Sequence, residues 1–172
     1  RRKVDARHFP AGVDRRVNAR GIDVAQYVDL LIGVVPAINL EWIQKIHRDC
    51  AHGRCSPEAT VETILRRMDD YIHYIVPQFG LTDINIQRIP LVDTSNPFIA
   101  RDVPTESECA FVVHFRDRER HDFVDLLHRI PGAQMTRATT MLIPGGVLGH
   151  ALEDICAPIL ADLIKKRHAV KQ

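Results

Sequence analysis

The amino-acid sequence predicts an α/β fold, because apolar runs of strand length alternate with amphipathic helical patterns. Residues 29–35 form a nearly continuous apolar run, which is typical of a strand covered on both faces of a sheet. A helical pattern follows directly at about residues 40–50. Later in the chain, the β-rich residues 109–115 and 139–143 flank a short helical pattern at residues 122–130.

A long helix is predicted to start at residue 56. Ser56 provides an N-cap, Pro57 fits the first helical position, and Glu58 adds a carboxylate to the first turn. Apolar residues at helical spacing continue to about Val76, and Pro77 ends or kinks the helix. We expect this apolar stripe to pack into the core: Val61, Ile64, Leu65, Met68, Ile72 and Ile75.

The remaining elements follow from alternation, turn chemistry and helical spacing. Residues 84–87 alternate like a half-buried strand, and residues 88–93 complete a strand pair or lead to the next edge. Residues 94–97 indicate a turn. A final helix at residues 147–167 contains Pro158, which should bend it. Its expected buried face consists of Leu148, Leu152, Ile155, Ile159 and Leu163.

Length and composition indicate an ordinary globular protein. The chain has 172 residues and a formal net charge of +1, so it fits one domain that buries about two-thirds or more of its unfolded surface. Apolar runs are broken by Gly, Pro or charge, and we expect neither a membrane span nor a signal peptide. The 4 cysteines should be reduced thiols, and a cytoplasmic location is the default expectation.

The most informative chemistry lies in the helix at about residues 40–50. Lys45, Arg48 and Asp49 follow i, i+3, i+4 spacing, so they share one helix face directly after a predicted strand. An open α/β sheet binds ligands outside the carboxyl ends of its strands, where an Arg fork beside a Lys ammonium suits a phosphate group. The alternative is a solvated helix face with one Asp–Arg ion pair. Helix packing is the preferred interpretation for Glu41 and Trp42.

Two other clusters suggest weaker hypotheses. Residues 47–55 contain two His and two Cys, a composition that can hold Zn²⁺. Structural zinc ligands usually come as two separated pairs, and His47 lies on a helix face committed to other contacts, so we expect no metal.

Residues 1–21 are rich in Arg and Lys with little apolar periodicity. They indicate a tail, a truncated or mis-framed start, or a local divergence, with a basic arm for nucleic acid as the alternative.

Six sequence words, at residues 32–36, 39–49, 64–68, 75–79, 82–85 and 92–101, resemble in their order and spacing those of the bacterial-type phosphoribulokinase family. The two most specific words lie at residues 41–49 and 92–101. The resemblance runs from about Ile22 to about Lys166. It therefore leaves residues 1–21 unmatched and assigns residues 22–172 to the family. The words are Ile32-Gly-Val-Val-Pro36, Asn39-Leu-Glu-Trp-Ile-Gln-Lys-Ile-His-Arg-Asp49, Ile64-Leu-Arg-Arg-Met68, Ile75-Val-Pro-Gln-Phe79, Thr82-Asp-Ile-Asn85 and Val92-Asp-Thr-Ser-Asn-Pro-Phe-Ile-Ala-Arg101.

The resemblance implies the C-terminal portion of a P-loop-kinase-like mixed sheet with flanking helices. It also implies ATP-dependent phosphorylation of ribulose 5-phosphate to ribulose 1,5-bisphosphate in the Calvin cycle, with ATP and Mg²⁺ as cofactors. The family's Gly-rich phosphate loop, catalytic-base Asp and metal-side acidic residue have no match in this sequence. The single glycine pair, Gly145-Gly146, lacks the Lys-Ser/Thr signature and indicates a turn. We therefore expect the isolated chain to lack kinase activity.

The resemblance also implies roles for individual residues. Lys45 stabilises charge on the phosphoryl group in flight, and Arg48 holds the 5-phosphate of ribulose 5-phosphate. Asp49 orients Arg48 and the sugar hydroxyls or assists at the metal. Arg54 is a further substrate-binding candidate, although it is displaced by one residue from the family's loop Arg. The pair at residues 66–67 matches a family pair, with an exposed-helix role as the alternative.

Bacterial members of the family are activated by NADH through arginines in the C-terminal part. Arg137 matches one of these, whereas His114 stands where a second is expected. A homo-oligomer is expected as well. A non-catalytic remnant of the same fold, which binds sugar phosphate or forms oligomers, is the alternative function, and a small zinc or nucleic-acid module is a third.

Overall fold

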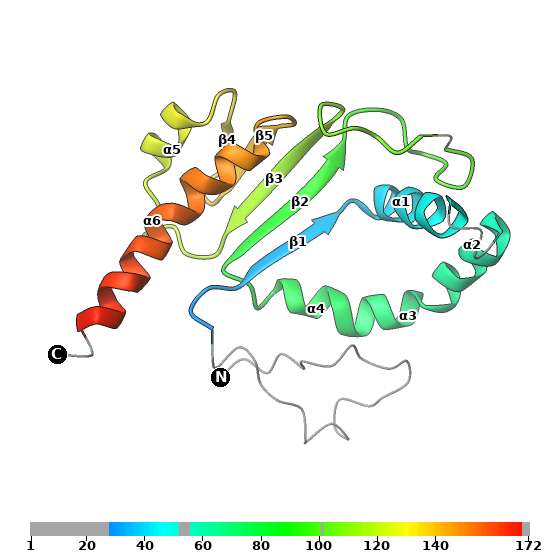
Figure 1. The fold of residues 1–172 in the computed structure, drawn as a ribbon, viewed down its shortest axis with the longest axis horizontal. Helices are drawn as coiled ribbons and strands as arrows, with labels where there is room; N and C mark the ends of the chain where they lie inside the picture. The colour runs from blue at the N-terminus through cyan, green and yellow to red at the C-terminus, as the bar shows by residue number, and fades with distance from the viewer. Residues whose placement is uncertain (1–27, 52–55, 101, 170–172) are drawn as a thin grey trace, which may run out of the picture.

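The computed structural model describes residues 28–51, 56–100 and 102–169. In this part of the chain, five strands form one mixed sheet in the order β1-β2-β3-β5-β4 (Figure 1). β1 and β2 are parallel, and the other neighbours are antiparallel. The predicted α/β class is confirmed. The strands are β1 (Ile32–Pro36), β2 (Ile84–Pro90), β3 (Cys109–Phe115), β4 (Gln134–Arg137) and β5 (Thr140–Pro144).

Helices flank this sheet and connect its strands. One group follows β1 and leads back to β2, and the other packs on the antiparallel strands (Figure 1). The first group consists of α1 (Ile38–Ala51), α2 (Pro57–Arg66), α3 (Met68–Asp70), the π-helical turn η2 (Tyr71–Ile75) and α4 (Val76–Phe79). The second consists of α5 (Phe123–Arg129) and α6 (Leu148–Ala169).

The main core lies between one face of the sheet and the pair α5 and α6. Alternate residues of β2, β3 and β5 point to this face, as the period of two in a strand requires. Ile155 of α6 is buried, and the other predicted residues of its apolar face pack at the margin of the core or are partly buried. The sheet residues that belong to this core are Ile84, Ile86, Phe111, Val113, Phe115, Met141 and Ile143.

β1 departs from the prediction of a strand covered on both faces. Val34 is paired in register with Ile86 on the same sheet face, yet Val34 is 71% exposed and Ile86 is 2% exposed. Ile32 is 41% exposed beside the buried Ile84. The core formed with α5 and α6 includes side chains of β2, β3 and β5 but none of β1. This face of β1 is therefore open among the described residues.

The predicted long helix starts as expected but is interrupted. The Ser56 hydroxyl accepts a hydrogen bond from Ala59 N at 3.3 Å, which confirms the N-cap. The backbone leaves helical geometry at Arg67 (φ −97°, ψ 8°), and after α3 and η2 the chain continues through Pro77 to the end of α4. Pro77 thus lies in the first turn of α4, where a proline is tolerated.

The prediction that the whole apolar stripe of this helix packs into the core is wrong. Ile64 is 8% exposed, whereas Leu65, Ile72 and Ile75 are 55%, 51% and 40% exposed. Leu65 follows Ile64 by about 100° around the helix axis, so the two side chains lie on different faces of α2. Ile72 and Ile75 lie in the π-helical turn, whose extra residue per turn rotates the apolar stripe away from the core.

The C-terminal elements agree closely with their sequence patterns. β3 has the predicted bounds, and Asp122 caps α5 by accepting hydrogen bonds from two backbone N–H groups. β4 is an additional edge strand that the sequence patterns do not predict. The predicted turn at Gly145-Gly146 is confirmed, and the two glycines differ. A Cβ on Gly145 would lie 1.8 Å from the Glu106 carbonyl oxygen, whereas Gly146 has φ +80° and open space around it.

Candidate functional site

α1 starts at the carboxyl end of β1, as the sequence predicts. Ala37 N donates to the Arg88 carbonyl of β2 at 2.7 Å, and Glu41 N donates to the Ala37 carbonyl at 2.9 Å, so the chain turns directly from strand to helix. The apolar face of α1 is anchored by residues that are 0% to 7% exposed: Leu40, Ile43 and Ile46. This anchoring sets the rotation of the helix and directs its charged face away from the core.

Lys45, Arg48 and Asp49 are brought together on that charged face. Asp49 lies between the two cations, with Lys45 Nζ at 2.6 Å from its Oδ2 and Arg48 Nε at 3.3 Å from its Oδ1. The hydrogen bond from Lys45 is the main reason why the pKa of Asp49 lies below its ordinary value of 3.8, and Arg48 adds to the effect. At neutral pH the cluster therefore holds two cations and one carboxylate, an arrangement that suits an anionic ligand.

Glu41 adds a carboxylate that sequence reasoning assigned to packing. It precedes Lys45 by four residues, so it lies on the same side of α1 one turn earlier. The Glu41 side chain is partly buried, and burial raises its pKa above the ordinary value of 4.5. Burial also raises the pKa of Tyr71 in η2, and the charge of Glu41 contributes to that shift. The i, i+4 spacing to Lys45 was the signal available in the sequence.

α1 also holds the loop that follows β2. Asn39 Nδ2 donates to the Thr94 carbonyl at 3.0 Å, and Trp42 stacks on Phe98 with ring centroids 5.5 Å apart. A ring nitrogen of His47 lies 3.0 Å from the Ala100 carbonyl oxygen. The packing interpretation of Trp42 is confirmed. His47 is engaged with this loop, while residues 52–55, which carry the other half of the predicted His/Cys cluster, lie outside the described residues.

Of the remaining candidates, His114 and Arg137 lie apart from the charged face of α1. Arg54 is outside the described residues, and the pair at residues 66–67 is exposed at the end of α2. Arg137 and His114 are both in register with Thr140, one from each neighbouring strand, and His114 Nδ1 is 3.3 Å from Thr140 Oγ1. Because β1 and β4 are opposite edges of the sheet, three strands separate Arg137 from β1, whereas β2 alone separates His114 from it.

Comparison with known proteins gives the family. The sequence model of the "Phosphoribulokinase / Uridine kinase family" matches residues 9–95. The chain belongs to this family. The match starts at residue 9, and the domain boundary placed at residue 22 lies outside the described residues.

The similar proteins are phosphoribulokinases. The chain is 53% identical over 147 residues to the phosphoribulokinase of Sinorhizobium medicae, covering 86% of this chain and 51% of that protein. It is 46% identical over 164 residues to the chromosomal phosphoribulokinase of Cupriavidus necator, covering 95% of this chain and 56% of that protein. The chain thus spans about half the length of the curated relatives it matches.

A solved structure supports the same assignment. The phosphoribulokinase from Rhodobacter spheroides aligns with a TM-score of 0.79 and 50% sequence identity, over 84% of this chain and 52% of that chain. The resemblance inferred from the sequence words is confirmed, and so is the phosphoribulokinase-like mixed sheet with flanking helices. Among the described residues, no helix is both long and apolar enough to cross a lipid bilayer.

Proposed function

We propose that this chain forms the sugar-phosphate side of a phosphoribulokinase active site. The reaction transfers the γ-phosphoryl group of ATP to ribulose 5-phosphate. The O1 hydroxyl of the sugar attacks the γ-phosphorus and loses its proton to a base, while the bond to the β,γ-bridging oxygen breaks and ADP leaves. The observation that carries the proposal is the Lys45–Asp49–Arg48 cluster at the carboxyl end of β1, in a chain that is 50% identical to a solved phosphoribulokinase.

The chemistry of each side chain supports a distinct role. Lys45 is a compact ammonium on a flexible stem, and it stabilises the charge on the phosphoryl group during transfer. The Arg48 guanidinium has the planar fork that fits the 5-phosphate of the sugar. Asp49, which contacts both cations, orients them before substrate binds. Arg54 is the fourth member of this proposal, as a loop residue that meets the substrate.

ATP and Mg²⁺ are the cofactors of this proposal. A kinase uses Mg²⁺ to neutralise the phosphates of ATP. The described residues do not bring three or more His, Cys, Asp or Glu side chains together in a metal-binding group. Asp49 is the acidic residue of the cluster and the one that would assist at the ion. None of the roles given above for Lys45 and Arg48 depends on a metal bound by this part of the chain.

A chimeric enzyme tests the proposal. This chain replaces the matched segment of the Sinorhizobium medicae phosphoribulokinase, with which it shares 53% identity, and ADP release is measured as ribulose 5-phosphate is varied. We expect turnover. Lys45→Met should lower mainly kcat, whereas Arg48→Ala should raise the KM for ribulose 5-phosphate roughly ten- to a hundredfold, the effect of about 1.5–3 kcal/mol for a charge-assisted contact.

The control is Arg118→Ala, since Arg118 is exposed in the turn before α5 and belongs to no part of the cluster. It should leave both kinetic constants unchanged. A folded chimera that binds ribulose 5-phosphate without turnover would favour the alternative, a non-catalytic sugar-phosphate-binding remnant. Unchanged sugar-phosphate kinetics in Arg48→Ala would show that the assigned role is wrong.

Three finer features complete the proposal: activation by NADH, assembly into a homo-oligomer and a cytoplasmic location. The support for an effector site is the juxtaposition of His114 and Arg137 about Thr140, where an imidazole and a cation lie on the two strands that flank β5. In the chimera, Arg137→Ala should abolish activation by NADH without changing basal turnover. Activation that persists in this variant would contradict the assignment of Arg137.

A further inference from the structure

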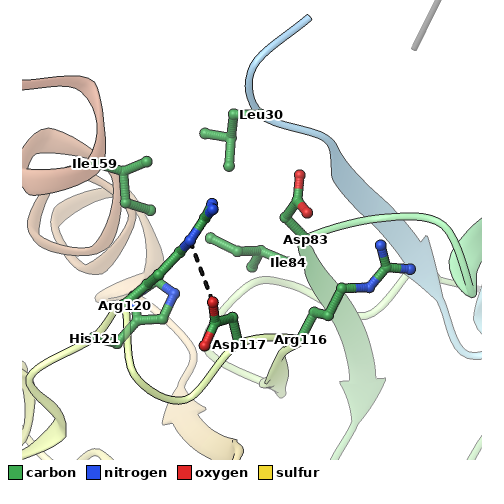
Figure 2. Close-up of a pocket in the computed structure, with 8 residues that line it drawn as sticks. All are labelled: Leu30, Asp83, Ile84, Arg116, Asp117, Arg120, His121 and Ile159. Carbon is green, nitrogen blue, oxygen red and sulfur yellow. Dashed lines mark ion pairs between the residues drawn. The ribbon is translucent and has the colours of Figure 1, made fainter. Parts of the chain in front are cut away.

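A cavity of about 160 Å³ opens at the end of the sheet remote from α1 (Figure 2). Because β1 and β2 are parallel and α1 leaves the carboxyl end of β1, the opposite ends of both strands meet at this cavity. Its lining comes from five separate parts of the chain: the approach to β1, the start of β2, the end of β3, the turn before α5, and α6. No residue of the cavity takes part in the proposed kinase function.

The cavity has an apolar wall. Ile84 is 1% exposed and belongs to the main core, and Leu30 and Ile159 are partly buried against that core. The guanidinium of Arg120 extends over Ile84 toward the space between Leu30 and Ile159 (Figure 2). A hydrocarbon group in this space would therefore lie against aliphatic side chains with a guanidinium at one end.

The two carboxylates of the cavity already accept hydrogen bonds or ion pairs from the protein. Asp83 Oδ2 accepts from Leu31 N at 2.9 Å. Asp117 Oδ1 accepts from Glu119 N at 3.0 Å, and its Oδ2 is 3.3 Å from Arg120 Nε. The acceptor groups of the cavity are thus largely engaged in holding the surrounding turns.

Donor capacity, in contrast, is left over. Arg116 donates to the Gly80 carbonyl. The Arg120 side chain, which is 63% exposed, engages only its Nε, and its two terminal nitrogens have no protein acceptor among the described residues. The His121 ring is packed on Phe115 with centroids 4.5 Å apart. Burial lowers the pKa of His121 below 6.5, so the ring is neutral at pH 7 and its N–H is another donor without an acceptor in the described part of the chain.

We propose that this cavity binds a small aliphatic carboxylate, whose oxygens accept hydrogen bonds from the terminal nitrogens of Arg120 and whose hydrocarbon part lies against Leu30, Ile84 and Ile159. A guanidinium fork matches a carboxylate in two parallel hydrogen bonds. The two Asp and two Arg side chains of the lining cancel in formal charge, so a monoanion is not repelled. A cavity of about 150 Å³ accommodates a six-carbon ring, so a four-carbon acid fits here.

The cavity is too small for the larger ligands of the proposed kinase reaction. Pockets for drug-sized ligands have volumes of roughly 300–1,000 Å³, well above the 160 Å³ of this cavity. A nucleotide or a sugar bisphosphate therefore does not fit. The proposal does not rest on the kinase activity, and it can be tested on the full 172-residue chain.

Titration of the chain with three four-carbon probes tests the proposal, with isoleucine methyl groups followed by NMR. Butyrate should shift the methyl resonances of Ile84 and Ile159 with saturation, while those of Ile143, which is buried elsewhere in the core, stay in place. Butanol and butylammonium have the same number of carbon atoms but no carboxylate, and each should bind at least tenfold more weakly.

Variants of the turn before α5 complete the test. Arg120→Gln should weaken butyrate binding at least tenfold. Arg120→Lys keeps the charge but loses the planar guanidinium, so its affinity for butyrate should lie between those of the wild type and Arg120→Gln. Arg118→Gln is the matched control in the same turn and should bind butyrate as the wild type does. Butylammonium or butanol binding as tightly as butyrate, no saturable shift with butyrate, or an unchanged affinity in Arg120→Gln would each overturn the proposal.

Discussion

Val34 and Ile86 are cross-strand neighbours on one face of the sheet, but their exposed fractions are 71% and 2%. Both are β-branched aliphatic residues, so residue type does not explain the difference. Ile86 lies in the covered region, which consists of β2, β3, β5, α5 and α6. Val34 lies in the open region, which consists of β1, α1 and α2. Burial on this face of the sheet is thus decided by which strands the two C-terminal helices reach.

The largest expected effect comes from truncating one residue of this pair. Ile86→Ala should lower the free energy of unfolding by about 2–5 kcal/mol, because it removes buried methyl groups and leaves a cavity in the covered region. Val34→Ala is the matched control and should change it by less than about 0.5 kcal/mol. Urea unfolding followed by circular dichroism measures both. Equal losses in the two variants would mean that Val34 is buried in solution.

The second prediction concerns the contact between the two covering helices. Arg129 of α5 forms an ion pair with Asp154 of α6, whose side chain is 6% exposed, and Asp154 Oδ2 has no hydrogen-bond partner. Arg129→Met leaves a buried carboxylate without its cation and should reduce the free energy of unfolding by about 1–3 kcal/mol. The upper end of the buried-pair range is not expected, because the Arg129 side chain is 46% exposed.

The control for that variant is Asp125→Asn, which removes a second, exposed partner of Arg129 at 3.4 Å. This change should have almost no effect on urea unfolding. Loss of stability in Asp125→Asn as large as in Arg129→Met would show that the buried carboxylate is not the source of the effect.

The open region provides the third prediction, since α2 depends more on local interactions. Ser56→Ala removes the hydroxyl that caps α2 and should reduce the free energy of unfolding by about 1 kcal/mol. Ser56→Asp should retain most of the stability because its carboxylate is also a good cap. A loss in Ser56→Asp equal to that in Ser56→Ala would argue against capping as the mechanism.

The smallest expected effect is on the pH dependence of stability, through His121, which packs on Phe115 of the covered region. Burial lowers the pKa of His121 in the folded protein below its ordinary value of 6.5, so the unfolded chain binds this proton more readily. The contribution of His121 to stability is complete above about pH 6.5 and falls as the pH drops from there toward the lower pKa of the folded state. His121→Phe keeps a ring against Phe115, and the unfolding free energy of this variant should depend less steeply on pH in that window.

The regular elements of this protein were largely predictable because their patterns are local. β3 is an uninterrupted β-rich run, and Ser56 and Asp122 are N-caps that the sequence displays directly. β4 was not predictable, since Met135 is its single apolar residue and the strand lies at an exposed sheet edge. The break at Arg67 has no neighbouring Pro or Gly to indicate it.

The charged cluster of α1 and the cavity also differ in how far the sequence could predict them. Lys45, Arg48 and Asp49 meet because they are close in sequence on one helix, so helical spacing alone brings them together. The cavity at the end of the sheet remote from α1 is lined by Leu30, Asp83, Arg120 and other residues from distant segments. No local pattern records such a site. Likewise, the exposure of Val34 depends on where α6 packs, which the sequence of β1 does not contain.

The glycine pair between β5 and α6 has a consequence for how this sequence can vary. At position 145 the obstacle is the neighbouring backbone, with the Glu106 carbonyl oxygen 1.8 Å from where a Cβ would stand, so a saturation library should retain no substitution there. At position 146 the obstacle is only the backbone conformation, with φ +80°, so Asn and Asp should persist at reduced frequency. Two adjacent and chemically identical residues are therefore under different constraints, one absolute and one graded.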